Sequence, residues 1–408
     1  MSKLFECVEI LDFKRIPLSA KQREGKEKIY PYYGAQGIID YVDDYLFDGE
    51  YILVAEDGNN LKSLNENIAT WAEGKFWVNN HAHILGKKQG YNLKYMYYLI
   101  NSLDLRGYIT GSAQPKLNQD NLANLKLEIP DKTIQDKIVG ILSALDKKIE
   151  INQKVTIKLE SMVKTIYDYW FMQFEFPNEE GKPYKSSGGK MVWNEELKRE
   201  IPEEWANGTL EDLGEIVAGG TPSTNHPEYY SENGIAWITP NDLSNSNDKY
   251  ITHGERDISE IGINNSSARL MPEGTVLLTS RAPIGYLGIA ANEVCTNQGF
   301  KSIVPNGKFG SEFIYYTVEK MIGYLKLLGT GSTFTEISKA VVAKVKIVIP
   351  EELIVKRFEE MVLDICAKRK IIEKENKELV ALRDFLLPLL MNGQVSFKSS
   401  YIEKNENL

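Results

Sequence analysis

Apolar residues recur at alternating steps of three and four in two long segments of the chain, residues 131–171 and 351–393. In the first segment the series runs through Leu142, Leu145, Ile149, Asn152, Thr156, Leu159, Val163, Ile166 and Trp170. In the second, less regular segment it runs through Ile365, Lys368, Ile372, Glu375, Leu379, Leu382, Leu386 and Leu389. This spacing is a heptad seam and predicts two long helices. Either stripe alone could equally be a helix packed on a domain core.

Short β-like runs bounded by Gly, Asp or Asn precede each helix and predict strands. Residues 51–55 and 76–78 fit strands, 93–103 fit an amphipathic helix, and Leu125, Leu127 and Ile129 alternate up to Pro130. The same order returns later, with strand-like runs at 276–279 and 343–349 around a helical run at 313–328. We therefore expect two similar α+β domains, residues 1–130 and 205–350.

The two domains end in blocks that align without a gap, GSAQPKLNQDNLANLKLEIP at 111–130 and GSTFTEISKAVVAKVKIVIP at 331–350. Each block leads directly into one long helix. The pattern predicts a pseudo-two-fold molecule in which the helices pair antiparallel, with polar seam residues fixing their register. Helices of roughly 35 residues would span on the order of 50 Å, about one and a half turns of duplex DNA.

Residues 172–204 lack a periodic apolar stripe and contain several turn formers, including Gly181, Pro183, Gly188 and Gly189. This composition predicts a flexible or loosely packed connector at the surface. Residues 394–408 are expected to be a C-terminal tail.

Composition narrows the class of protein. With 42% apolar and 26% charged residues, the 408-residue chain fits a soluble protein of two domains. No run of apolar residues is long enough to predict a membrane span, and the N-terminus does not resemble a secretory signal. Cys7, Cys295 and Cys366 form no CxxC pair, so we expect a reducing cytoplasm and no structural zinc. The net charge of −9 argues against non-specific nucleic-acid binding.

Candidate catalytic motifs are weak. The string GKPYKSSGGKM resembles a phosphate loop, but Met191 follows Lys190 where that motif needs Ser or Thr. Gly329 and Gly331 form a lone GxG that opens no βαβ unit, and no Gly-x-Ser-x-Gly elbow occurs. His81 and His83 could share one strand face, yet without nearby cysteines they do not predict a metal site. We expect a non-catalytic chain with no cofactor or metal of its own.

Polar, turn-rich segments remain as candidate binding surfaces. Gln and Asn can pair with adenine and Arg and Lys with guanine, whereas Ser, Thr and Tyr can hold phosphates. The candidates are Tyr32, Tyr33, Gln36, Gln114, Lys116 and Asn118 in the first domain, and Thr221, Ser223, Asn241, Arg281, Ser332, Thr333 and Thr335 in the second. Any single loop could instead be an ordinary solvated turn. However, AQPKLNQ and TFTEISK occupy equivalent places and differ in every functional group, which favours one scaffold with two specificities.

Several segments together resemble the specificity subunit of type I restriction-modification systems. They include the 111–130 block with its helix, the connector FPNEEGKPYKSSGGKMVWNEELKREIPEEW, GGTPS, WITPNDLS, TSRAPIGYLGIA, TNQGFKSIVP and LRDFLLPLLMNGQVSF. The resemblance implies two target-recognition domains, each reading half of a split asymmetric site in double-stranded DNA, joined by antiparallel helices. It also implies two modification subunits that use S-adenosylmethionine and restriction subunits that use ATP and Mg. The first domain departs from the pattern, because it lacks a clear match to residues 205–220, and its first strand is expected to be either short or packed differently.

Two other classes stay open at the level of sequence, an enzyme in its own right and an adaptor whose helices only join proteins. If the recognition reading holds, Gln114→Ala or Lys116→Ala should weaken recognition of one half-site only. An adaptor would protect no bipartite site in a footprint of the complex, and an enzyme would methylate or cut DNA alone.

Overall fold

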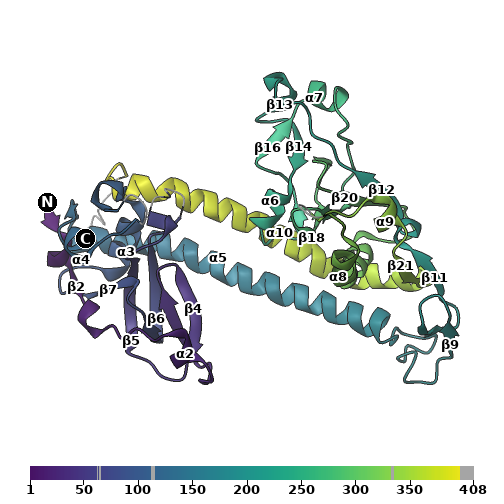
Figure 1. Cartoon of the computed structure of the whole chain (residues 1–408), viewed down its shortest axis with the longest axis horizontal. Helices are drawn as coiled ribbons and strands as arrows, with labels where there is room; N and C mark the ends of the chain where they lie inside the picture. The colour runs from purple at the N-terminus through teal and green to yellow at the C-terminus, as the bar shows by residue number, and fades with distance from the viewer. Residues whose placement is uncertain (62, 64–65, 112–114, 332–334, 396–408) are drawn as a thin grey trace, which may run out of the picture. The chain divides into compact units, whose positions relative to one another are not determined.

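The computed structural model describes residues 1–61, 63, 66–111, 115–331 and 335–395, and they form two compact units. Unit 1 comprises Met1–Glu150 together with the segment that starts at Glu378, and unit 2 is Ile151–Lys377. Both units combine sheets with helices (Figure 1). Each unit therefore includes part of both long helices instead of ending at residue 130 or 350.

Unit 1 is built on one six-stranded sheet with the order β2-β7-β5-β6-β3-β4. All neighbouring strands are antiparallel except β3 and β6. The strands are β2 Val8–Ile10, β3 Tyr30–Gly34, β4 Gly37–Val42, β5 Phe47–Ala55, β6 Ala69–Val78 and β7 Ala82–Lys87. Along β5 the buried side chains alternate, so that Ile52 and Val54 join one core cluster and Leu53 joins another. The helices are α1 Leu4–Cys7, α2 Ala20–Arg23, α3 Leu93–Ser102 and α4 Gln119–Ala123.

Unit 2 contains a five-stranded sheet, β12-β20-β17-β18-β15, and a four-stranded sheet, β13-β16-β14-β19. The first comprises β12 Gly214–Ala218, β15 Tyr250–Ile251, β17 Val276–Ser280, β18 Ile284–Ala290 and β20 Lys301–Pro305. The second comprises β13 Tyr230–Ser231, β14 Ile235–Ile238, β16 Arg256–Ile258 and β19 Val294–Thr296. The helices are α6 Pro240–Ser244, α7 Glu260–Asn264, α8 Ser311–Leu328 and α9 Lys339–Ala343.

The two units repeat one ladder near their closing prolines. In unit 1, β1 (Ser2–Lys3) pairs with β8 (Lys126–Leu127), and in unit 2, β11 (Ala206–Thr209) pairs with β21 (Lys346–Ile349). Lys3 faces Lys126 just as Thr209 faces Lys346, and Lys126 and Lys346 also match in the sequence repeat. The first strand of unit 1 is therefore short, as expected. The predicted strand up to Ile129 is limited to the two residues of β8.

The long helices are α5 (Lys132–Tyr167) and α10 (Glu352–Met391), and α5 continues into a π-helical turn, Asp168–Met172. They contact each other inside each unit. In unit 1, Arg383 lies 3.3 Å from Asp146. In unit 2, the Asn152 amide donates to Glu375 at 2.6 Å, and Arg369 pairs with Glu160. Contact positions rise along α5 as they fall along α10, so the predicted antiparallel pairing is confirmed in both units.

The predicted seam of α5 is largely correct. Leu142, Ile149, Asn152 and Val163 are buried, and Leu145, Leu159 and Ile166 are half-buried. On α10, Ile372 is buried and Ile365, Leu379 and Leu386 are half-buried.

Two predicted seam members of α10 are wrong, because Lys368 is exposed and Leu382 is 44% exposed. Their neighbours Arg369 and Arg383 face α5 instead. A long cationic side chain can line a helix seam while its head group pairs with an acid, and apolar periodicity does not reveal this.

The prediction of a loose connector at 172–204 is also wrong. Phe174, Phe176 and Ile201 are buried in the main core of unit 2. The Phe176 ring stacks on Trp205 and on Tyr184, with centroids 4.9 and 4.6 Å apart. A short hairpin of β9 (Met191–Asn194) and β10 (Arg199–Pro202) completes the segment. Irregular chain can bury aromatic side chains without any helical or strand period, so the lack of a stripe was misleading.

Among the helices of the described residues, none is long and apolar enough to cross a membrane.

Candidate nucleic-acid interface

The candidate loop of unit 1 leaves the domain through a narrow clasp of backbone hydrogen bonds. Thr110 and Lys116 exchange two N–H to carbonyl bonds of 2.8 Å each. The next N–H, that of Leu117, donates to the Glu56 carbonyl at the end of β5 at 2.9 Å. The clasp holds the ends of the 111–115 segment together and fixes where it leaves the sheet. Gln114 lies outside the described residues.

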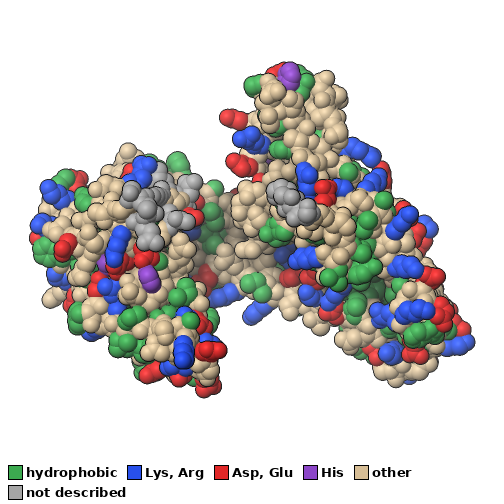
Figure 2. Space-filling view, in the orientation of Figure 1, with side chains coloured by type: hydrophobic (Ala, Val, Ile, Leu, Met, Phe, Trp, Pro, Cys, Tyr) green, Lys and Arg blue, Asp and Glu red, His purple; other side chains and the backbone are tan. Residues whose placement is uncertain are grey.

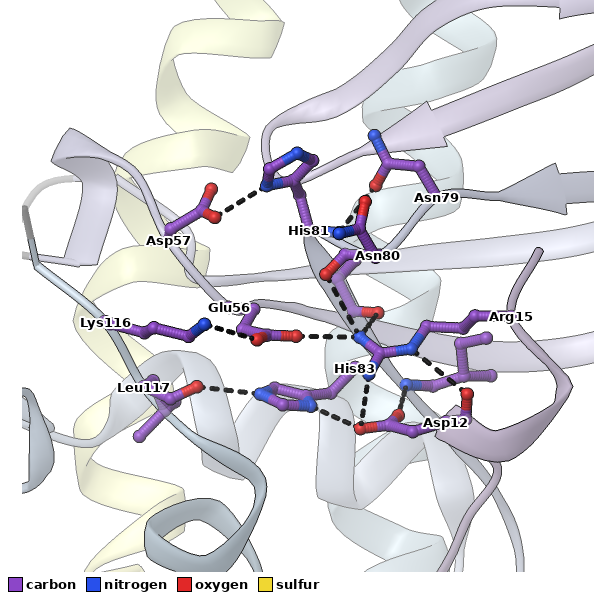
Figure 3. A network of polar contacts seen from close by, with 12 residues as sticks. Asp12, Arg15, Glu56, Asp57, Asn79, Asn80, His81, His83, Lys116 and Leu117 are labelled. Atoms are coloured by element: carbon purple, nitrogen blue, oxygen red, sulfur yellow. Dashed lines mark hydrogen bonds and ion pairs between the residues drawn. The ribbon is translucent and has the colours of Figure 1, made fainter. Parts of the chain in front are cut away.

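A buried polar network supports the clasp from below (Figure 3). The His83 side chain is 1% exposed, and its Nε2 donates to the Leu117 carbonyl at 2.8 Å. Its Nδ1 lies 2.5 Å from the Asp12 carboxylate, which also accepts from the Ile84 backbone at 2.9 Å. Each buried polar group thus has a partner, as a rigid support requires.

Glu56 joins the buried network to the surface. Its carboxylate accepts from Arg15 at 2.8 Å and pairs with Lys116 at 3.1 Å. Burial alone would raise the pKa of Glu56, but the hydrogen bonds from Arg15 and Lys116 outweigh it and lower that pKa. The side chain of Lys116 is 55% exposed, so its ammonium group remains accessible to an anionic ligand.

Two more exposed polar groups lie beside the clasp. The His81 ring lies 2.6 Å from the Asp57 carboxylate and is 51% exposed (Figure 3). Gly58 follows with φ of +121°, and a Cβ there would lie 3.4 Å from the Gln36 side-chain nitrogen. The glycine therefore allows the β3–β4 turn that carries Gln36 to approach the β5 end closely. Gln36 is exposed.

Three other candidates of unit 1 have internal roles. Tyr32 is 1% exposed, and its hydroxyl accepts from the Leu18 N–H at 2.9 Å and donates to the Leu18 carbonyl at 3.2 Å. Tyr33 is 9% exposed and packs edge-on against Phe76. The expectation that these tyrosines lie on a polar surface is wrong, because β3 is an interior strand whose aromatic side chains fill the core. Asn118 accepts from the Asn121 N–H at 2.8 Å and caps α4.

Unit 2 carries the same clasp. Thr330 and Glu336 exchange backbone bonds of 3.0 and 2.9 Å, and the Ile337 N–H donates to the Ser280 carbonyl at 3.0 Å. Thr335, just inside the clasp, is exposed, whereas Ser332 and Thr333 lie outside the described residues. The backbone frame of the candidate loop is therefore repeated, while its side chains differ.

The charged side chains at this second clasp are Arg281, Lys301 and Glu336. The Glu336 carboxylate lies 3.6 Å from Arg281 and 3.5 Å from Lys301. Lys301 also donates to the Ser280 hydroxyl at 3.2 Å. Burial lowers the pKa of Lys301, and the attraction of Glu336 partly opposes this. Arg281 is the more accessible cation, with 33% of its side chain exposed.

Two of the three remaining candidates of unit 2, Thr221 and Asn241, lie near one segment, residues 297–299. Thr221 donates to the exposed Gln298, and a Cβ at Gly299 would lie 2.9 Å from the Pro240 ring, next to Asn241. Thr221, Ser223 and Asn241 are all exposed, and the Ser223 hydroxyl accepts from the Asn225 N–H at 3.4 Å. The structure thus brings Thr221 and Asn241 close to residues 297–299. This segment is followed in the chain by Phe300 and then by Lys301 of the second clasp.

Sequence reasoning missed several polar residues at the two clasps: Glu56, Asp57, His81, Gln298, Lys301 and Glu336. Most of them end or begin strands, and polar residues at strand ends are a usable though weak signal. In the described part of the chain, no group of three or more His, Cys, Asp or Glu side chains is arranged to hold a metal ion.

The family described as "Type I restriction modification DNA specificity domain" matches residues 1–161 and 202–378, and the chain belongs to this family. The predicted family and the predicted α+β class with two similar units are thereby confirmed.

Named relatives agree. The chain is 40% identical over 215 residues to the MjaIX specificity subunit of a type I restriction enzyme from Methanocaldococcus jannaschii. That match covers 51% of this chain and 49% of the relative, so the chain spans about half the length of this relative. It is 27% identical over 332 residues to the HindI specificity subunit of Haemophilus influenzae, covering 69% of this chain and 71% of the relative.

A solved structure shares the fold. The S subunit of a type I restriction-modification system from M. genitalium superimposes with a TM-score of 0.64 over 95% of each chain, at 15% identity.

Proposed function

We propose that this chain is the non-catalytic DNA-specificity subunit of a type I restriction-modification complex, and that each unit reads one half of a split, asymmetric site. The repeated clasp carries this proposal. It presents two loops through the same backbone bonds, yet Lys116 in one unit corresponds to Glu336 in the other. Such a chain is suited to two different half-sites. Family membership supports the same function.

Exposed side chains around each clasp divide into base-reading and phosphate-holding groups. In unit 1, Gln36 can pair with adenine, and Lys116 can bind guanine or a phosphate. In unit 2, Asn241 and Arg281 have the corresponding base-reading chemistry, whereas the Thr221 and Ser223 hydroxyls suit phosphates. Both units thus offer amide and cationic groups in accessible positions.

The charge of the chain argues for partners that share the grip on DNA. Lys and Arg side chains are interspersed with Asp and Glu on the visible face (Figure 2), and the net charge is −9. A protein that holds a duplex mainly through phosphates needs a cationic surface. We therefore assign most of the non-specific grip to the modification subunits, which would also supply S-adenosylmethionine, while restriction subunits would use ATP and Mg.

The long helices are the proposed spacer and docking face. With 36 and 40 residues, α5 and α10 would measure about 54 and 60 Å. Both expose large apolar side chains, which favours burial by another protein. The exposed residues are Ile141, Ile151, Ile157 and Met162 on α5, and Leu353, Met361, Leu363, Ile371, Leu382 and Phe385 on α10.

The experiment uses the assembled complex and the sites of adenine methylation in the host genome. Methylome sequencing should give one bipartite motif with two different halves. Duplexes altered in one half or the other then test Gln36→Ala and Asn241→Ala. We expect each variant to weaken discrimination of one half-site only, by about tenfold to a hundredfold, the effect of losing one bidentate base contact.

Two results would refute the proposed function. One is a complex that protects no bipartite site, as expected of an adaptor. The other is methylation or cleavage of DNA by the purified chain alone, as expected of an enzyme. Equal loss at both half-sites for either variant would refute the assignment of units to halves.

A further inference from the structure

The two clasps differ in one systematic way, the sign of their charges. In both units a strand end forms an antiparallel bridge to the base of the loop, Asp57 to Lys116 in unit 1 and Arg281 to Glu336 in unit 2. The sequence repeat also aligns Lys116 with Glu336. These two pairs therefore occupy equivalent positions in the two units.

In unit 1 the strand end is acidic and the loop base is cationic. Glu56 and Asp57 follow the last residue of β5, and Lys116 pairs with Glu56 at 3.1 Å. The Glu56 side chain is only 15% exposed and is also bound by Arg15 at 2.8 Å, so its carboxylate is fixed in place. Lys116 is thus drawn to an anchor that is part of the domain.

In unit 2 the arrangement is reversed. Arg281 follows the strand end, and Lys301, with 9% of its side chain exposed, lies beneath it. Both cations are within 3.6 Å of the Glu336 carboxylate at the loop base. An acid at the base of a loop that meets DNA would repel phosphates, whereas the two cations of its own unit attract Glu336.

We propose that Lys116 and Glu336 are positioning residues whose opposite charges lock each recognition loop to its own unit. This inference rests on the proposed function for the role of the loops. The residue at the foot of each loop, Lys116 or Glu336, lies beside a strand end of opposite charge. The same residue placed in the other unit would meet like charges. The amino-acid sequence at the tip of each loop is then free to vary. The charge of residue 116 or 336 must only stay opposite to that of the strand end in its own unit.

Amide hydrogen exchange of the full chain without DNA tests this lock directly. The reporters are the Thr110 and Leu117 amides, which close the clasp of unit 1. In Lys116→Glu a third carboxylate would join Glu56 and Asp57, and we expect exchange about tenfold faster, because like-charge contacts are costly when partly desolvated. Lys116→Gln, the uncharged control, should accelerate exchange only about twofold to threefold.

The rescue variant combines Lys116→Glu with Asp57→Arg, which places an arginine opposite the new acid, as Arg281 lies opposite Glu336 in unit 2. It should return both amides to within about threefold of the wild-type rate. The mirror set in unit 2 is Glu336→Lys, Glu336→Gln, and Glu336→Lys combined with Arg281→Asp, with Thr330 and Ile337 as reporters. Wild-type exchange in Lys116→Glu, or no rescue by the second substitution, would overturn the proposal.

Binding of the assembled complex to a duplex that carries the bipartite site separates this inference from the proposed function. We expect Lys116→Glu to weaken only the half-site read by unit 1, and the rescue variant to recover at least part of that loss. Lys116→Glu and the rescue variant could instead lose the same affinity for this half-site and show the same amide exchange rates. That result would also count against the lock. A wild-type complex that binds no bipartite site would refute the proposed function and would leave the exchange result valid.

Discussion

The helices α3 and α8 correspond in the two units, and in each unit the following long helix accepts a backbone N–H from the start of this helix, although at different positions. In unit 1 the Asn92 N–H donates to the neutral side chain of Gln135 at 2.8 Å. In unit 2 the Phe313 N–H donates to the carboxylate of Glu359 at 2.9 Å. The pKa of Glu359 is raised to about 7, mainly by burial and also by repulsion from Glu312, although the Phe313 hydrogen bond opposes this rise.

Gln135 is buried and Glu359 is half-buried, so this difference does not lie on an exposed loop. Side-chain divergence between the repeats is therefore not confined to surfaces that could read a sequence. The recognition loops combine two features. The two units share the backbone clasp, and the exposed side chains around it differ between them. A comparison of the repeats by sequence alone weighs buried and exposed changes equally and would miss this distinction.

The largest expected difference between the units concerns the arginines of the helix seam. Arg369 in unit 2 binds Glu373 at 2.6 Å and also pairs with Glu160, with 9% of its side chain exposed. Arg369→Ala would remove the cation that Glu160 and Glu373 share and should lower the free energy of unfolding by about 3–5 kcal/mol. Arg383→Ala in unit 1 is the matched control, because Arg383 is 32% exposed, and should cost about 1 kcal/mol or less.

Urea unfolding of the full chain measures both arginine variants, and amide exchange assigns each loss to its unit. Similar losses of unfolding free energy in the two variants would mean that burial does not determine how much each arginine stabilises its unit.

The next effect is a pH dependence that only unit 2 should show. The pKa of Glu359 is about 7 in the folded chain against an ordinary value of 4.5, so stability is greatest below pH 4.5 and falls as the pH rises through 7. The loss is about 3 kcal/mol at full ionisation. Glu359→Gln keeps the acceptor for Phe313 and should remove this loss, which makes the variant more stable than wild type at pH 8.

The matched substitution in unit 1 is Gln135→Glu, which should introduce the same pH dependence there. Unfolding free energies of the three proteins at pH 5 and pH 8 provide the measurement. If Glu359→Gln follows the wild-type curve between those values, the buried carboxyl does not titrate in this range.

The smallest effect tests the register of α10 within unit 1. Leu382 is 44% exposed, whereas Leu390 on the same helix is 3% exposed and belongs to the core. Leu382→Ala should therefore change stability by only about 0.5 kcal/mol, and Leu390→Ala should cost about 3 kcal/mol. Thermal unfolding of the two variants compares them. A larger loss of stability in Leu382→Ala would support the sequence prediction that Leu382 belongs to the helix seam.

Much of the fold was predictable because it depends on local pattern. The alternation in β5 and the helical stripe of α3 gave correct elements, and the aligned repeat revealed two similar units. The position of Leu382 was mispredicted because a three-four pattern admits neighbouring registers when long cationic side chains occupy part of the seam. Tyr32 and Tyr33 were misplaced because polar hydroxyls in a turn-rich segment suggest exposure, although a buried hydroxyl needs only local partners such as Leu18.

The site was less predictable because its contacts are long-range. Glu56 acts through Arg15 and Lys116, and no periodicity links these positions. The correspondence of Lys116 with Glu336 was visible in the repeat, but the opposing charges at Asp57 and Arg281 emerged only when the strand ends were paired. The candidates Gln114, Ser332 and Thr333 remain predictions, since they fall outside the described residues.

The buried hydrogen bond between Asn152 and Glu375 has a consequence for synthesis on the ribosome. Its two residues are 223 positions apart, so α5 is made roughly 10–45 s before its partner at about 5–20 residues per second. During that interval the apolar seam of α5 could associate with the same seam on a neighbouring nascent chain. Such a pairing would leave the Asn152 amide without its acceptor, at a cost of about 1–3 kcal/mol. The Asn152–Glu375 pair thus favours packing of α5 against α10 of the same chain over packing against α5 of a neighbouring chain.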